Sequence, residues 1–290
     1  MRLVFLGTPQ AAVPSLTALV GAGHEVKLVV TRPDRRRGRG SELMASPVKR
    51  AALDLGLRVG HSLSELDGLD VDRGVVVAYG AMIPAKLLDR VAMLNVHFSL
   101  LPRWRGAAPV ERAILAGDLE TGVSVMSLEP ELDTGPVHLE RRVVVGEKTA
   151  SQLTAELAEL GAAALIEVLG SPELLDHPRV QVGDVTYAEK LTKETFHLRT
   201  DMSVEELRRT VRLGRAFALV NGRRLRVDVV HVASRTAPPG TIELVEGEVV
   251  MGCADGAVVL DEVQPEGSRP MTAPAWWAGA RLEMTTVAWA

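Results

Sequence analysis

The sequence predicts an α/β domain with a parallel sheet, followed by a smaller domain of short β-strands. The chain starts with an apolar strand at residues 3–6, a glycine turn at 7–9 and an apolar helix. Residues 75–78 read Val-Val-Val-Ala, a run typical of a strand buried on both faces of a parallel sheet. Beyond residue 220, short strand patterns alternate with Gly, Pro, Asn and Asp, which favours a small barrel or sandwich.

Two helices frame the first domain. The first carries apolar residues at 16, 19 and 20 and is expected to end near Gly23. The helix that closes the domain starts at Thr149, where Gln152 completes a possible capping box. The other strands of this domain are expected at residues 24–31, 93–98, 123–128 and 137–145.

The hydrophobic pattern of the first domain stops between residues 170 and 205, which are rich in polar positions and have no sustained period. We therefore place the first domain at residues 1–184, a linker at 185–203 and the second domain at 204–290. Strands of the second domain are expected at residues 223–232, 240–244, 249–253 and 258–263.

Composition indicates a soluble globular enzyme. Hydrophobic residues make up 47% and charged residues 24% of the 290 positions, unlike a disordered chain. The single cysteine, Cys253, cannot form an internal disulfide, and the sequence shows neither a secretory leader nor an apolar run of about 18 residues. We therefore expect a cytoplasmic protein without a membrane segment.

Positive charge is concentrated in two stretches of an acidic chain. The net charge of −4 argues against a general nucleic-acid binder. However, five arginines lie between residues 32 and 39, and nine arginines stand against four acids between residues 199 and 235. Each stretch is either a local site for phosphate groups or a solvated surface.

Residues 95–109 hold the densest set of chemically useful groups. Alternate residues of a strand share a face, so Asn95 and His97 would project together and donate hydrogen bonds to an oxyanion in acyl transfer. Asp133 lies in a turn fixed by Gly and Pro and would hold His97 oriented or charged. The alternative, a structural histidine beside an Asx turn, is the commoner meaning of such a pattern.

Signatures of other cofactors do not occur. No His-x-x-x-His or Cys-x-x-Cys spacing is present, so we expect no zinc or other metal site. The turn at residues 7–9 lacks the further glycines of a dinucleotide fingerprint, and no Gly-Lys-Ser/Thr follows a glycine loop. Neither NAD nor ATP is indicated.

Several segments resemble the formyltetrahydrofolate-dependent formyltransferase family. The segments are Asn95–Pro109, Ala116-Gly-Asp118, Thr121-Gly-Val123 and Leu132-Asp-Thr-Gly-Pro136. Other stretches resemble the members that act on methionyl-tRNA, so the resemblance covers nearly the whole chain. These stretches are residues 5–9, the loop from Arg32 to Lys49, Thr186–Leu191, Pro239–Ile242 and 264–271.

The resemblance implies a Rossmann-like formyltransferase domain followed by an OB-like β-barrel domain that binds tRNA. It also implies transfer of the formyl group of 10-formyltetrahydrofolate to the free amino group of methionyl initiator tRNA, with no obligate protein partner. Asn95, His97 and Asp133 would be catalytic. Folate would contact Ser99, Leu100, Leu101 and Pro102, and tRNA would contact Arg35, Arg36, Arg37, Arg39 and Lys49.

The chain departs from the family pattern at three places. Phe98 and Glu131 replace common glycines, and residues 213–220 lack a Pro-rich, Trp-bearing stretch. Two alternatives stay open: an enzyme that formylates a glycinamide ribonucleotide or an amino sugar nucleotide, and an inactive folate- or RNA-binding protein. The loop from Arg32 to Lys49, which we call the arginine loop, the second domain and the intact Asn, His and Asp favour transfer to methionyl-tRNA.

Overall fold

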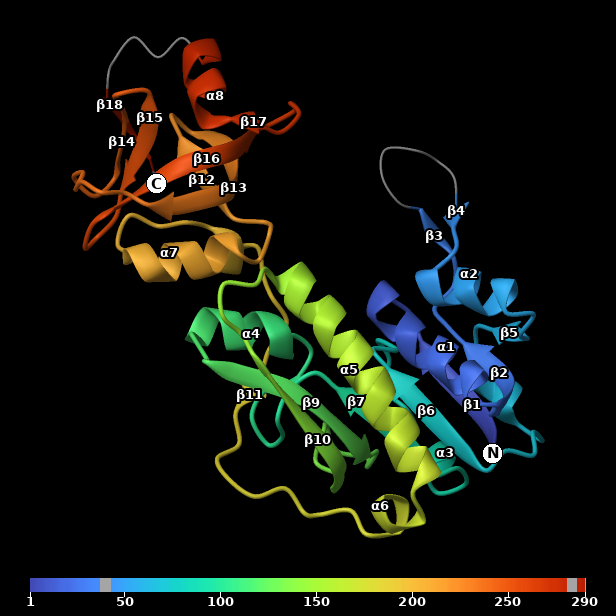
Figure 1. The fold of residues 1–290 in the computed structure, drawn as a ribbon. Coiled ribbons are helices and arrows are strands. Elements are labelled where there is room, and N and C mark those ends of the chain that lie inside the picture. Colours follow the sequence, from blue (N-terminus) through green and yellow to red (C-terminus); the bar gives the residue numbers. More distant parts are fainter. Residues whose placement is uncertain (37–42, 281–285, 290) are drawn as a thin grey trace. The chain divides into compact units, whose positions relative to one another are not determined.

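The structure, a computed structural model, describes residues 1–36, 43–280 and 286–289. Within these residues the chain forms two compact units, each built on its own seven-stranded sheet (Figure 1). The first unit contains residues 1–110, 120–144 and 153–189, and the second contains residues 111–119, 145–152 and 190–290. Arg37 and Arg39, two of the predicted tRNA contacts, lie outside the described residues.

The sheet of the first unit has the strand order β10-β9-β7-β6-β1-β2-β5. Its strands from β7 to β5 are parallel, whereas β9 and β10 run antiparallel at one edge. This confirms the predicted α/β domain, and the antiparallel strands β9 and β10 match the strands expected at residues 123–128 and 137–145. The strands are β1 (Arg2–Gly7), β2 (Glu25–Val30), β5 (Val59–Gly60), β6 (Arg73–Val77), β7 (Met93–His97), β9 (Glu120–Ser127) and β10 (Val137–Val144).

Two short strand pairs lie outside this sheet. The antiparallel pair β3 (Arg35–Arg36) and β4 (Leu43–Met44) lies within the arginine loop. The parallel pair β8 (Arg105–Gly106) and β11 (Tyr187–Ala188) joins residues that are far apart in the sequence. Both pairs depend on partners that no local pattern specifies.

Helix α5 (Ala150–Gly170) packs against the sheet of the first unit (Figure 1). Gly161 permits the close approach, because an ideal Cβ there would lie 2.6 Å from Val96 Cγ1 on β7. The predicted capping box is confirmed: the Thr149 amide donates to Gln152 and the Gln152 amide donates to Thr149. The other helices of the fold before residue 190 are η1 (Gln10–Ala12), α1 (Val13–Gly21), α2 (Pro47–Asp54), η2 (Leu63–Leu66), α3 (Ala85–Leu88), α4 (Pro109–Ala116) and α6 (Pro172–Asp176).

The second unit contains a curled antiparallel half-barrel with the order β12-β13-β16-β15-β14-β18, which confirms the expected small β-domain. An isolated bridge between Val220 and Trp289 joins the two edges of this path. Trp276 and Trp277 of one helix are buried in its core. The elements are η3 (Glu194–Phe196), α7 (Val204–Val211), β12 (Phe217–Val220), β13 (Arg223–Val232), β14 (Thr241–Val245), β15 (Glu248–Gly252), β16 (Ala257–Pro265), β17 (Met271–Thr272), α8 (Ala273–Gly279) and β18 (Thr286–Ala288).

Burial follows the predicted pattern. The side chains at residues 3–6 are fully buried, as expected of a strand covered on both faces. Among the described residues, no helix is both long and apolar enough to cross a membrane.

Candidate active site

The predicted catalytic residues lie at the end of strand β7, on the side of the sheet where the parallel strands have their carboxyl ends. In the sheet register, Gly7 at the end of β1 pairs with Val77, and Val76 pairs with Asn95. The Thr8 hydroxyl donates to the Tyr79 carbonyl at 3.0 Å, which ties the loop after β1 to the loop after β6. Open α/β sheets bind their ligands at this edge.

Asn95 and His97 lie on β7 and face the same side of the sheet, as the strand period predicts. Their exposed fractions are 9% and 6%. Within the described part of the chain, the Asn95 amide side chain makes no hydrogen bond, so its NH2 group is available to a ligand.

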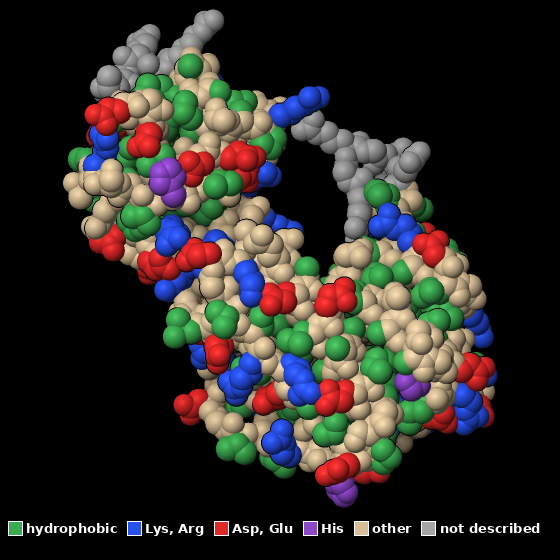
Figure 2. Space-filling model, in the orientation of Figure 1, with side chains coloured by type: hydrophobic (Ala, Val, Ile, Leu, Met, Phe, Trp, Pro, Cys, Tyr) green, Lys and Arg blue, Asp and Glu red, His purple; other side chains and the backbone are tan. Residues whose placement is uncertain are grey.

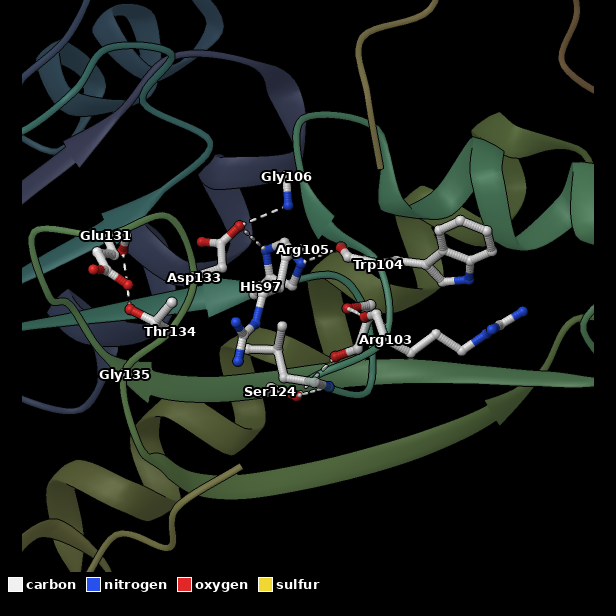
Figure 3. A network of polar contacts seen from close by, with 12 residues as sticks. His97, Arg103, Trp104, Arg105, Gly106, Ser124, Glu131, Asp133, Thr134 and Gly135 are labelled. Carbon is white, nitrogen blue, oxygen red and sulfur yellow. Dashed lines mark hydrogen bonds and ion pairs between the residues drawn. The ribbon is translucent and has the colours of Figure 1, made fainter. Parts of the chain in front are cut away.

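The ring of His97 is fixed by its surroundings. Its Nε2 lies 2.9 Å from the Trp104 carbonyl oxygen, and because a carbonyl only accepts, Nε2 is the donor. Its Nδ1 lies 3.6 Å from Asp133 Oδ2, too far for a good direct hydrogen bond. Figure 3 shows the carboxylate and the ring facing each other.

Asp133 is held in an unusual backbone conformation, with φ of +52°. Its Oδ2 accepts a hydrogen bond from the Gly106 amide at 2.8 Å (Figure 3). Gly106 itself has φ of +123°, and a Cβ there would lie 2.8 Å from the Ala188 carbonyl oxygen. Glycine at 106 is therefore required for the contact that aims the carboxylate.

Residues 99–102 form a tightly bonded turn. The Ser99 hydroxyl donates to the Arg103 carbonyl, and the Ser124 hydroxyl donates to the Ser99 carbonyl at 2.8 Å. Leu101 is buried against Met126 and Val137, and Pro102 is also buried. Among these four residues, only Leu100 has a partly exposed side chain. The folate contact predicted for this segment stays a prediction, carried by Leu100 and by the main chain.

The basic residues predicted to bind tRNA lie in different surroundings. Arg35 is exposed and lies on β3, within the arginine loop. Lys49 on α2 pairs with Asp34, with Nζ and Oδ2 2.6 Å apart. The ion pair ties α2 to the residue before β3, so Lys49 has a structural partner in addition to its predicted ligand.

Much of the second arginine-rich stretch is used inside the fold. Five of its members, Arg199, Arg208, Arg209, Arg226 and Arg235, form ion pairs with acids. The stretch that departs from the family pattern, residues 213–220, ends in β12, whose Phe217 stacks on His197 with the ring centroids 4.9 Å apart. Arg224 lies 4.1 Å from the Phe217 ring centroid.

The other two departures are accommodated locally. Phe98 lies beside Gly161 of α5, where an ideal Cβ would stand 3.7 Å from Phe98 Cε1. Glu131 is exposed, and its carbonyl accepts a hydrogen bond from the Thr134 hydroxyl at 3.3 Å. Neither residue displaces the Asn, the His or the Asp.

Sequence reasoning missed the residues that support the loops carrying Asp133 and Trp104. Gln181 donates to the loop that carries Asp133 and accepts from Arg105. Thr186 accepts a hydrogen bond from the Trp104 amide at 2.8 Å. The family resemblance of residues 186–191 was a signal for Thr186. Gln181 gave none, because a residue 48 positions from Asp133 in the sequence has no local pattern that links the two.

Comparison with known proteins assigns the chain to a family. Residues 1–169 match the formyl transferase family, and residues 190–281 match the formyl transferase C-terminal domain. These two matches define a formyl transferase. The chain is also 42% identical to the methionyl-tRNA formyltransferase of Thiobacillus denitrificans over 305 residues, covering 99% of both chains. It belongs to the methionyl-tRNA formyltransferase family.

Solved structures show the same fold at lower sequence identity. HypX from Aquifex aeolicus in complex with tetrahydrofolic acid matches with a TM-score of 0.67 and 18% identity, covering 95% of this chain and 46% of that one. Methionyl-tRNA formyltransferase from Clostridium thermocellum matches with a TM-score of 0.56 and 15% identity, covering 80% and 94%. In the described residues, no group of three His, Cys, Asp or Glu is placed to hold a metal ion.

Proposed function

We propose that this chain transfers the formyl group of 10-formyltetrahydrofolate to the amino group of methionyl initiator tRNA. The observation that carries the proposal is the placement of Asn95, His97 and Asp133 at one edge of the sheet. The acceptor is supported by full-length relatives near 40% identity, which are methionyl-tRNA formyltransferases.

The reaction needs donors aimed at charge that appears only during transfer. The neutral methionyl amine attacks the formyl carbon, a new C–N bond forms, and the carbonyl oxygen becomes an oxyanion. The free NH2 of Asn95 and the Nδ1–H of a protonated His97 supply the donors, since Trp104 occupies Nε2. As the intermediate collapses, the bond from the formyl carbon to folate nitrogen breaks.

The proton balance assigns a role to Asp133. The attacking amine must lose one proton, and the departing folate nitrogen must gain one. Asp133, 3.6 Å from His97 Nδ1, stabilises the charged ring and moves this proton through a bridging water. A positioned general acid or base of this kind contributes about 10²–10⁴-fold to the rate.

Replacing Asn95 tests the mechanism. We expect Asn95→Ala to lower turnover about 10²–10³-fold, which is the usual cost of losing one oxyanion donor. Thermal unfolding is the control for folding. Turnover within a few-fold of the wild type, in a folded variant, would show that Asn95 does not bind the oxyanion.

For tRNA, we propose that Arg35, Arg36, Arg37, Arg39 and Lys49 contact the phosphate backbone while the C-terminal β-domain holds the acceptor arm. On the face shown in Figure 2, Lys and Arg side chains are interspersed with Asp and Glu. Contacts from the arginine loop would therefore supply a large part of the electrostatic attraction.

The function is tested by supplying labelled 10-formyltetrahydrofolate with three parallel acceptors: Met-charged initiator tRNA, Met-charged elongator tRNA and glycinamide ribonucleotide. We expect label on the initiator tRNA. Label on the ribonucleotide alone would keep the formyl chemistry and overturn the tRNA assignment. Label on no acceptor would favour a protein that binds folate or RNA without activity.

A further inference from the structure

The segment that follows helix α5 includes α6 and runs along the loops of the candidate active site. We call residues 171–188 the strap. It hydrogen-bonds to the start of β10, to the loop that carries Asp133 and to the segment that contacts His97. Its contacts are His138 Nδ1 to the Leu174 carbonyl, two backbone hydrogen bonds between Val137 and Arg179, the Gln181 side chain to the Asp133 loop, and the Trp104 amide to Thr186.

Gln181 is the member of the strap that reaches the Asp133 loop with its side chain. Its Nε2 donates to the carbonyl oxygens of Asp133 and Gly135, both at 2.8 Å. Its Oε1 accepts from Arg105 Nε at 3.1 Å and from Arg105 Nη2 at 2.6 Å. Both hydrogens and both lone pairs of the amide are used, so four hydrogen bonds fix its orientation.

These bonds join the two segments that control the carboxylate. Asp133 has φ of +52°, a conformation that costs free energy for a non-glycine residue and persists only when its surroundings enforce it. Gln181 fixes the Asp133 carbonyl from one side, and Arg105 immediately precedes Gly106, whose amide donates to the Asp133 carboxylate. One side chain therefore sets the backbone of Asp133 and the segment that aims its side chain.

We propose that Gln181 is a positioning residue for formyl transfer, which holds Asp133 and the Arg105–Gly106 strand in the geometry that faces His97. This inference rests on the proposed function of Asp133. Gln181 contacts the backbone of Asp133 and not the carboxylate, so it acts through Asp133 and touches no reacting atom. A misplacement of about 1 Å at such a group can lower the rate about 10²-fold.

Two substitutions separate the two halves of the amide. Gln181→Met removes all four hydrogen bonds at similar length, and Gln181→Glu keeps an acceptor for Arg105 while losing the donors to the Asp133 loop. We expect each variant to lower kcat by about 10- to 100-fold, with both KM values changed less than about threefold. Val182→Ala is the matched control, because Val182 is the next residue on the strap and is 87% exposed. We expect it to leave kcat unchanged.

A double-mutant cycle with Asp133→Asn gives the decisive readout. If Gln181 acts through Asp133, then Gln181→Met should change kcat by less than about threefold when Asp133 is already Asn. An equal loss in both backgrounds would overturn the inference, as would a rise in KM alone. A kcat loss no larger than the unfolded fraction, measured by circular dichroism, would also overturn it.

The cycle also separates this inference from the proposed function. If Asp133→Asn is inactive while both Gln181 variants keep wild-type kcat, only the role of Gln181 is wrong. If Asp133→Asn keeps wild-type kcat, the proposed role of Asp133 is wrong, and the role of Gln181 fails with it.

Discussion

Replacing Gly135 with alanine would place a methyl group against the backbone of β9. An ideal Cβ at Gly135 would lie 1.9 Å from the Ser127 carbonyl oxygen, whereas real Cβ atoms essentially never come within 3.0 Å of such a neighbour. Ser127 cannot retreat easily, because its amide donates to the Pro136 carbonyl at 2.9 Å and its hydroxyl bonds to His138. The loop at residues 132–136 must therefore move.

The size of the movement sets the size of the effect. The separation must grow from 1.9 Å to 3.0 Å, a shift of about 1 Å, and a misplacement of that size costs about 10²-fold in rate. The same overpacking should lower the free energy of unfolding by about 1–3 kcal/mol. The shift moves Asp133, which is two residues away, and it also disturbs the bond from Gln181 to the Gly135 carbonyl.

The assay measures formyl transfer under saturating substrates alongside urea unfolding. We expect Gly135→Ala to lower kcat about 10²-fold while both KM values stay within a few-fold. Gly170→Ala is the matched control, because an added Cβ at Gly170 meets nothing within 4 Å. A Gly135→Ala enzyme that is destabilised as expected yet keeps its kcat would refute the link between this loop and catalysis. A variant with neither effect would refute the packing itself.

Three further predictions concern pH, thiol reactivity and salt. Burial lowers the pKa of His138, whose neutral ring donates to the Leu174 carbonyl and accepts from the Ser127 hydroxyl. The free energy of unfolding should therefore fall as pH drops below the unfolded histidine pKa of about 6.5. Urea unfolding should show a smaller fall with pH in His138→Gln than in the wild type. Equal losses in both proteins would contradict this. Burial raises the pKa of Cys253 to about 11, so a thiol reagent at neutral pH should react only after unfolding, and rapid labelling of the folded protein would show the thiol to be accessible. The KM for Met-charged tRNA should rise steeply with salt, and a flat dependence would remove the phosphate contacts proposed for the arginine loop.

The regular elements were predictable because their signals are local. The continuous apolar run of β6, the capping box at Thr149 and the strands of the C-terminal sheet each depend on a few adjacent residues. Strand β12 was missed because its sequence Phe-Ala-Leu-Val is short and follows a segment with no clear period. The pairs β3–β4 and β8–β11 were missed because two-residue strands are too short to show a period, and β8 also pairs with residues about 80 positions away. The boundary predicted at residue 184 stays a prediction.

The chemical groups of the candidate site could be predicted from the sequence, but the hydrogen bonds that orient them could not. Strand alternation placed Asn95 and His97 on one face, and the turn residues around Asp133 indicated a fixed carboxylate. Sequence alone could not show that the Trp104 carbonyl occupies His97 Nε2, since that contact depends on the path of the loop after β7. The role of Gln181 was hidden for the same reason.

The strap determines where this enzyme can be divided or recombined. The family match to the first domain ends at residue 169, so a fragment cut there would retain Asn95, His97 and Asp133 and lose every hydrogen bond that the strap makes to their loops. Such a fragment would contain the reactive groups without the scaffold that orders them. Chimeras that exchange C-terminal domains between relatives should therefore be joined after Glu189, so that each catalytic domain keeps its own strap.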